Sequence, residues 1–194
     1  MKILRGQVKI LQILCAVCTV VVGIMSIIGC DGKDNEKQKD FTQPVLSVSP
    51  VDMLSVTSII PFGADLSPGR KNPAFEYYVD SPDVQVRASC GGVVKSIWLN
   101  DNFPDYEVWI RPSSESVYFV QYDHVIDLEV IVGERVTSGQ VLGTVGSGNR
   151  TELVIGSTDG GDVCYCPFDF ATDEFIQEHM SFTNQWCLVD TVLP

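Results

Sequence analysis

From Phe75 onward, apolar and polar residues alternate in short runs that are separated by turn residues. A period of two is typical of strands that bury one face. The runs predict strands at residues 76–79, 84–88, 92–99, 106–111, 117–124, 141–145 and 153–157. Polar turn residues separate several of them, as at 100–102 and 112–114. The pattern therefore predicts an all-β fold, either a small barrel or a sandwich.

Two segments ahead of this region are less regular. Residues 44–61 alternate loosely and predict one or two strands, whereas 66–74 are rich in proline, glycine and lysine and predict an exposed loop. One short helix is expected near the end of the chain. Thr172 can cap it, and apolar residues at 175, 176 and 180 fall on one face. His179 lies in this helix and is expected at the surface.

The amino-terminal segment is apolar over most of its length. Residues 10–28 follow Lys2, Arg5 and Lys9, and this order of charge and hydrophobicity is typical of a secretory signal peptide. The run ends in Gly29-Cys30, which resembles a bacterial lipobox. That resemblance implies cleavage after residue 29 and lipidation of Cys30, so we expect residues 1–29 to be a lipoprotein signal peptide.

A single transmembrane helix is the alternative interpretation, since the run is long enough to span a bilayer. Both interpretations place the rest of the chain outside the cytoplasm, attached to a membrane at the periplasmic face or the cell surface. Residues 30–43 are polar and charged and predict a flexible tether, which leaves residues 44–194 for the domain. Asp31 resembles the inner-membrane retention signal of some Gram-negative lipoproteins, but the choice between inner and outer membrane stays open.

The charge of the chain restricts its partners. The formal net charge is −12, and all 25 acidic residues follow the apolar run. A surface this acidic repels nucleic acid and anionic lipid headgroups. Two interpretations of this surface stay open: the acidic residues only keep it well solvated, or they attract a basic partner.

Four cysteines lie beyond the lipobox: Cys90, Cys164, Cys166 and Cys187. An even number in an oxidising compartment predicts two disulfides. A bond between Cys164 and Cys166 would be strained, so we expect one of these two to pair with Cys187. Zinc binding by the Cys-x-Cys pair ranks lower, because the four cysteines beyond the lipobox include no Cys-x-x-Cys pair.

A glycine-rich hairpin motif carries the most specific pattern. In residues 130–145, Gly133 and Gly139 permit tight turns on either side of Val136, which is expected in the core. The spacing V-G-x-x-V-x-x-G-Q-x-L-G resembles the barrel-sandwich hybrid fold of biotinyl and lipoyl carriers and of M23 (LytM-like) peptidoglycan peptidases. A carrier needs a lysine at a hairpin tip, and this chain has no lysine after Lys95.

The peptidase family fits better over residues 61–170. Pro61-Phe62-Gly63, residues 84–94, Tyr122-Asp123-His124-Val125 and Cys166-Pro167-Phe168 resemble motifs of M23 domains in the same order. The resemblance implies that Ala74 and Tyr78 stand where the H-x-x-x-D motif belongs. It also implies that Arg150 and Glu152 replace the H-x-H motif. Three zinc ligands are therefore missing, and no cofactor is expected.

His124 matches the family histidine that assists the reaction beside the zinc. Without a metal, we expect a retained residue that is hydrogen-bonded to Asp123 or to the backbone. The resemblance makes Tyr78, His124, Arg150 and Glu152 candidate groove residues. Tryptophans at 98, 109 and 186 could stack on a glycan or pack in the core.

These observations predict a non-catalytic envelope lipoprotein with a degenerate M23-like domain. Its expected role is binding or regulation, with peptidoglycan or a peptidoglycan hydrolase as partner. Two alternatives remain open, a zinc endopeptidase with unusual ligands and a purely structural envelope lipoprotein.

Overall fold

The computed structural model describes residues 38–193. The elements in this range are, in chain order, η1 (Met53–Ser55), β1 (Val56–Ile60), β2 (Asp65–Ser67), β3 (Arg70–Lys71), β4 (Phe75–Val79), β5 (Gln85–Arg87), β6 (Gly92–Leu99), β7 (Tyr106–Arg111), β8 (Tyr118–Ile126), β9 (Arg135–Val136), β10 (Val141–Val145), β11 (Arg150–Ser157), β12 (Val163–Tyr165), η2 (Pro167–Phe170), α2 (Asp173–Met180) and β13 (Thr191–Val192). No helix in the described range is long and apolar enough to cross a membrane.

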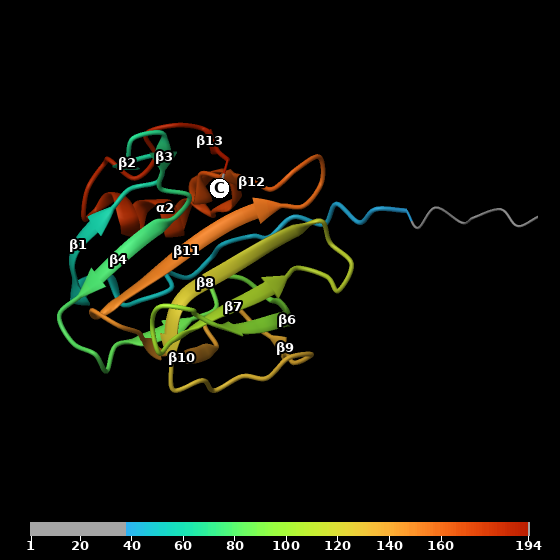
Figure 1. Ribbon diagram of the computed structural model, residues 1–194, viewed down its shortest axis with the longest axis horizontal. Helices are drawn as coiled ribbons and strands as arrows, with labels where there is room; N and C mark the ends of the chain where they lie inside the picture. The colour runs from blue at the N-terminus through green and yellow to red at the C-terminus, as the bar shows by residue number, and fades with distance from the viewer. Residues whose placement is uncertain (1–37, 194) are drawn as a thin grey trace, which may run out of the picture. The chain divides into compact units, whose positions relative to one another are not determined.

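Eleven strands form one antiparallel sheet, whose central order is β1–β4–β11–β8–β7–β6–β9 (Figure 1). Strand β10 pairs with β8 and β5, and β12 joins β13 to β11. Strands β2 and β3 form a separate hairpin. The prediction of an all-β domain with one short helix near the carboxyl end is confirmed.

The predicted strands correspond closely to the observed ones. The ranges expected at 92–99, 106–111 and 141–145 are β6, β7 and β10. The two glycine turns and the buried Val136 are confirmed, because Gly133 and Gly139 have φ angles of 89° and 84° and Val136 is buried. The hairpin itself is not formed, since β9 pairs with β6 whereas β10 pairs with β5 and β8. The segment 66–74, predicted as a loop, includes β3 and most of β2, which pair as a hairpin. These two strands are exposed, so no hydrophobic alternation marks them.

The predicted helix is confirmed as α2, and the Thr172 hydroxyl accepts a hydrogen bond from the Phe175 amide at its start. The surface position expected for His179 is wrong, because this residue is fully buried. Its ring bonds the Tyr77 hydroxyl at 2.9 Å and the Phe175 carbonyl oxygen at 2.8 Å. An aromatic cluster between β4 and α2, which includes Trp186, therefore forms much of this part of the core. Burial lowers the pKa of His179 to about 4 and keeps the ring neutral.

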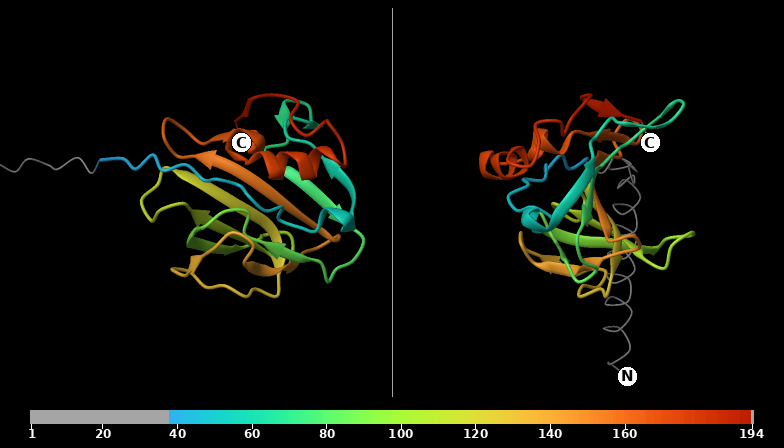
Figure 2. Two further views of the ribbon diagram at one scale, coloured as in Figure 1. Left: turned by 180° about the vertical axis from the view of Figure 1, so that it is seen from behind. Right: turned by 90° about the vertical axis from the view of Figure 1, so that its left-hand side faces the viewer.

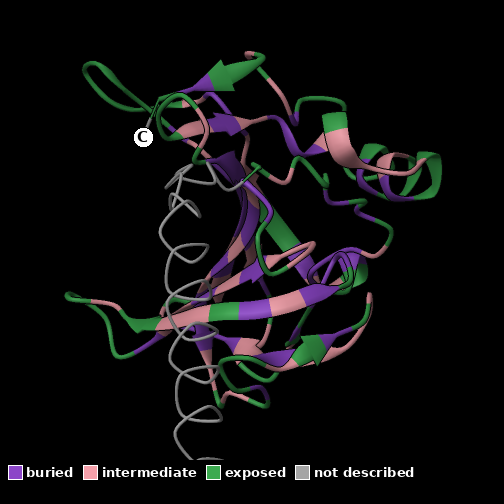
Figure 3. Ribbon diagram, turned by 90° about the vertical axis from the view of Figure 1, so that its right-hand side faces the viewer, coloured by how far each residue is buried: buried purple, intermediate pink, exposed green. Residues whose placement is uncertain are grey.

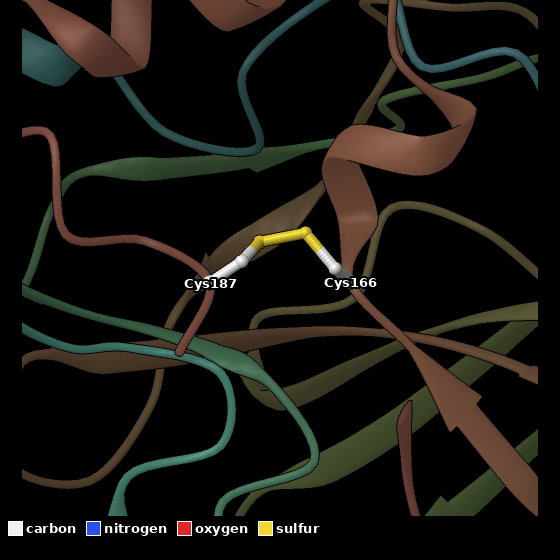
Figure 4. The surroundings of a disulfide bond; sticks show 2 residues. All are labelled: Cys166 and Cys187. Carbon is white, nitrogen blue, oxygen red and sulfur yellow. A yellow bond between two sulfur atoms is a disulfide. The ribbon is translucent and has the colours of Figure 1, made fainter. Parts of the chain in front are cut away.

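One disulfide joins Cys166, which precedes η2, to Cys187 in the carboxyl-terminal segment (Figure 4). This confirms the expected pairing with Cys187. The second disulfide is not formed, because Cys90 and Cys164 are buried free thiols. Burial raises the pKa of Cys90 to about 12 and that of Cys164 to about 11, so both are protonated at neutral pH.

The predicted signal peptide and Cys30 lie outside the described residues. The end of the predicted tether lies against the domain. The Val117 amide donates a hydrogen bond to the Asp40 carbonyl oxygen, and the Ser116 hydroxyl donates one to the Thr42 carbonyl oxygen. The limits of the predicted tether and domain stay predictions.

Candidate functional site

A cleft of about 830 Å³ lies over one face of the sheet. Its floor comes from β4, β11, β8 and β7. Its borders come from the segment around the β2–β3 hairpin and from the turn between β6 and β7. It contains all four of the predicted groove residues, which are Tyr78, His124, Arg150 and Glu152.

Strand alternation explains which side chains reach this cleft. In β11, Arg150, Glu152 and Val154 line it, whereas the intervening Thr151 and Leu153 are fully buried. The same rule holds in β4, β7 and β8, because successive side chains of a strand point to opposite faces of the sheet. The cleft residues of these strands are Glu76, Tyr78, Glu107, Trp109, Phe119, Gln121 and Asp123.

His124 breaks this alternation. Both Asp123 and His124 line the cleft although they are neighbours in β8. The backbone of His124 has a φ of 55°, in the left-handed region that residues other than glycine seldom adopt. Hydrogen bonds hold this conformation, since the His124 amide bonds the Asp123 carboxylate at 2.6 Å and the His124 carbonyl accepts from Gly146 at 2.7 Å. Strain of this kind concentrates at functional sites.

A buried carboxylate orients the His124 ring. Asp105 Oδ2 lies 3.0 Å from His124 Nδ1, and its side chain is fully buried. Asn100 donates to Asp105 Oδ1 at 2.7 Å, and the Ser147 amide donates to Oδ2 at 3.0 Å. Burial alone raises the pKa of the Asp105 carboxyl, but the bonds from Asn100, Ser147 and His124 outweigh burial and lower it. Asp105 is therefore ionised at neutral pH and accepts the Nδ1 proton of His124.

Arg150 occupies the other side of the histidine ring. Its Nη2 atom lies 2.6 Å from His124 Nε2, and its Nη1 atom donates to Glu76 Oε1 at 2.7 Å. Because a guanidinium only donates, His124 Nε2 accepts and the ring is neutral in this arrangement. Glu76 Oε1 also accepts a hydrogen bond of 2.6 Å from the Tyr78 hydroxyl. The guanidinium carbon of Arg150 also lies 5.5 Å from the centre of the Phe103 ring.

Protonation of His124 would change this arrangement. Burial lowers the pKa of His124, but the carboxylates of Glu152, Asp123 and Asp105 outweigh burial and raise it above its usual value. A proton on Nε2 would break the bond from Arg150. The protonated Nε2 would instead favour a hydrogen bond to Glu152, whose Oε1 atom lies 3.6 Å from Nε2.

The residues present do not fit the zinc centre that an M23 fold implies. A hydrolytic zinc needs three protein ligands and an open position for water. Two residues here that could ligate a metal, Glu76 and His124, accept hydrogen bonds from the cationic guanidinium of Arg150. A set of three residues, Asp105, Asp123 and His124, has possible ligand atoms within 4.8 Å of one another. Those carboxylates accept hydrogen bonds from Asn100, and His124 Nδ1 bonds Asp105.

Ala74 and Tyr78, the residues at the positions of the H-x-x-x-D motif, differ in exposure. Ala74 is fully buried, whereas Tyr78 is partly exposed and bonded to Glu76. His124 does bond Asp123 through its amide, as expected, but its ring bonds Asp105 and Arg150. Of the tryptophans, Trp109 lines the cleft, Trp98 is exposed and Trp186 is in the core.

The sequence did not identify Glu76, Asn100 or Asp105 as site residues. Glu76 carried a usable signal, since it is a lone acidic residue in the otherwise apolar strand Phe75–Val79. Asn100 and Asp105 lie at the ends of a polar turn, and nothing in the turn distinguishes them from ordinary solvent-exposed residues.

No protein-family model matches the sequence, and no curated protein is similar to it at the level required for a match. Solved structures do match. Helicobacter pylori Csd3 has a TM-score of 0.51 and 14% identity over 74% of this chain and 41% of that one. A chain of the SpoIIQ–SpoIIIAH pore-forming complex has a TM-score of 0.52 and 18% identity over 70% and 98% of the two chains.

A point mutant of the catalytic domain of EnpA, a prophage-encoded M23 protein from Enterococcus faecalis, has a TM-score of 0.47. It is 19% identical over 59% of this chain and 88% of that one. This chain spans less than half of the Csd3 chains that it matches. Since these identities are low, the likeness concerns the fold. The domain is M23-like, as the sequence motifs predicted.

Proposed function

We propose that this protein is a non-catalytic binding or regulatory module of the cell envelope and that its M23-like cleft is the binding site. The observation that carries the proposal is Arg150. Its guanidinium bonds Glu76 and His124 in the part of the cleft where the family motifs place the zinc ligands. A fixed cation there opposes the binding of a divalent cation and uses the groups that would hold it.

The proposed partner is peptidoglycan or a protein that acts on it. The match to a chain of the SpoIIQ–SpoIIIAH complex supports a protein partner, since that M23-like chain belongs to an assembly of two proteins. We also propose that Cys30 carries a lipid anchor, which would keep the domain close to the wall on the outer side of a membrane.

The non-catalytic part of the proposal is tested by measuring zinc and hydrolysis together. The full chain would be purified in detergent without chelator, analysed for zinc by elemental analysis and incubated with peptidoglycan sacculi. We expect substoichiometric zinc and no muropeptide release. Near-stoichiometric zinc with muropeptide release would contradict the proposal and identify a zinc endopeptidase with unusual ligands.

The binding part is tested by photo-crosslinking from inside the cleft. A photoreactive residue at Gln121, on the cleft floor, is compared with one at Asp83, an exposed residue that does not line the cleft. We expect a specific adduct from Gln121 alone when envelope fractions are added. Equal or absent adducts at the two positions would favour a purely structural lipoprotein.

A further inference from the structure

The cleft is a groove between two projecting hairpins. In the right-hand view of Figure 2, and from the opposite side in Figure 3, the β2–β3 hairpin and the β6–β7 hairpin project from the same side of the domain. Leu66 and Arg70 of the first and residues 100–103 of the second line the cleft. Its floor follows β11 from Arg150 to Val154 and continues to Thr158. At roughly 3.3 Å per residue, the groove is about 25 Å long, which suits seven or eight residues of extended chain.

Negative charge dominates the lining of this groove. Six carboxylates line it: Glu76, Asp101, Glu107, Asp123, Glu152 and Asp162. Two arginines oppose them, and Arg150 is already bonded to Glu76. With His124 neutral, the groove carries a formal charge of −4. An occupant of this groove has to supply positive charge, because a second anion would be repelled.

Two carboxylates in the middle of the floor, Glu107 and Glu152, are only partly compensated by neighbouring donors. Glu107 accepts one hydrogen bond of 3.0 Å, from Trp109 Nε1. Burial and the neighbouring charges of Asp123 and Glu152 raise the pKa of Glu107. Glu152 lies 3.8 Å from Arg150 Nη1 and 3.6 Å from His124 Nε2, beyond the length of a good hydrogen bond.

Apolar surface accompanies these charges. Phe103 and Leu66, one on each hairpin, are 43% and 41% exposed at the rim. On the floor, Trp109 stacks on Phe119 with 4.4 Å between ring centroids. Arg150 shows how a cation fits among these groups, since it bonds a carboxylate while its guanidinium lies beside the Phe103 ring. A lysine or arginine with apolar neighbours would match the same combination.

We propose that the groove binds an extended basic segment of a partner protein, in which lysine or arginine residues alternate with apolar ones. This inference rests on the proposed binding function and specifies its partner. Peptidoglycan stem peptides are the competing occupant, and their free carboxylates would meet the negative lining.

The experiment selects ligands from a displayed library of random nonapeptides on the immobilised full chain in detergent micelles. The test variant is Glu107→Gln with Asp162→Asn, which removes two charges from the groove. The control variant is Asp83→Asn with Glu129→Gln, which removes two charges from exposed residues that do not line it. We expect enriched peptides to be basic, and their dissociation constants to rise about tenfold in the test variant and less than twofold in the control.

Three results would overturn the inference: no enrichment, enrichment without a bias to basic residues, or an equal loss of binding in the two variants. Soluble muropeptides are measured in parallel. If muropeptides bind and basic peptides do not, the inference of a basic protein segment is wrong while the proposed binding function stands. Zinc-dependent hydrolysis of peptidoglycan sacculi would contradict the proposed function itself.

Discussion

At the scale of single residues, Arg150 determines the chemistry of the cleft. Its position two residues before Glu152 was visible in the sequence, because the H-x-H motif of the M23 family is recognised by spacing. Its partners were not visible, since Glu76 and His124 are 74 and 26 residues away along the chain. A motif fixes which residues replace the family ligands, whereas the contacts of the replacements depend on strand register.

Replacing Arg150 by methionine should lower the free energy of unfolding by about 2–3 kcal/mol. The change keeps most of the apolar stem but leaves the Glu76 carboxylate, of which 4% is exposed, without its cation. Urea unfolding followed by tryptophan fluorescence measures the change. The double variant Arg150→Met with Glu76→Gln should recover at least half of the loss. An unchanged free energy in the single variant would show that the ion pair contributes nothing.

His179 should make the protein less stable in acid. Its folded pKa is about 4, below the ordinary 6.5 of an unfolded histidine. The neutral ring therefore contributes stability that is fully present above pH 6.5 and is lost as the pH falls toward 4. At 1.36 kcal/mol per pKa unit, the contribution is about 3 kcal/mol.

The measurement compares urea unfolding of the wild-type protein and His179→Gln at pH 7 and pH 4. We expect the wild type to lose about 3 kcal/mol more than the variant over this range. His124 provides the contrast, because its raised pKa contributes stability at low pH that is lost as the pH rises. Equal pH dependence of the wild type and His179→Gln would mean that His179 is charged inside the fold.

At the scale of secondary structure, the sequence pattern predicted the long strands and the short β5, and it missed the other short strands after β4. Strands β6, β7 and β10 have five to eight residues and are rich in valine, isoleucine and aromatic residues, so the sequence marks them as strands. Strands β9, β12 and β13 have two or three residues, and only their pairing partners define them. The reversal at His124 was equally hidden, because a positive φ in a non-glycine residue leaves no pattern in the sequence.

The start of β6 should not tolerate any side chain at Gly92. A Cβ atom there would lie 2.3 Å from the carbonyl oxygen of Arg111 and 2.7 Å from a methyl carbon of Ile110. We expect Gly92→Ala to lower the free energy of unfolding by about 2–3 kcal/mol, because backbone of the paired strand β7 has to move.

Gly91→Ala is the matched control. The nearest atom to its added Cβ would be the Val136 carbonyl oxygen at 3.5 Å, an ordinary contact. Its stability should stay within about 0.5 kcal/mol of the wild type in the same unfolding measurement. Similar losses at Gly91 and Gly92 would show that the close approach of β6 to β7 is not the cause.

At the scale of the whole described domain, the carboxyl-terminal segment completes the fold. Backbone hydrogen bonds join Phe62 to Trp186 and to Leu188, and the disulfide ties Cys187 to the region of η2. Trp186 is fully buried in the aromatic cluster with His179. The extension is therefore part of the core, while the cleft on β4, β11, β8 and β7 carries the candidate site.

Breaking the Cys166–Cys187 disulfide should destabilise the domain by about 3 kcal/mol. The bond closes a loop between residues 21 apart, and constraining the unfolded chain over that length has this effect. Dithiothreitol should lower the free energy of unfolding of the wild type and leave the Cys166→Ala/Cys187→Ala variant unchanged. Without denaturant, alkylation should leave Cys90 and Cys164 unmodified. A disulfide between Cys90 and Cys164 in the mass spectrum would contradict the assignment.

The sequence by itself determined the longer strands, the glycine turns on either side of Val136, the helix cap and the M23-like character of the domain. Each of these depends on residues that are close together in the chain, so spacing and periodicity reveal them. Only the tertiary structure decided that His179 is buried, that Cys166 rather than Cys164 pairs with Cys187, and that Arg150 links Glu76 to His124. These features depend on contacts between distant segments, and strand register rather than local sequence determines which side chains meet.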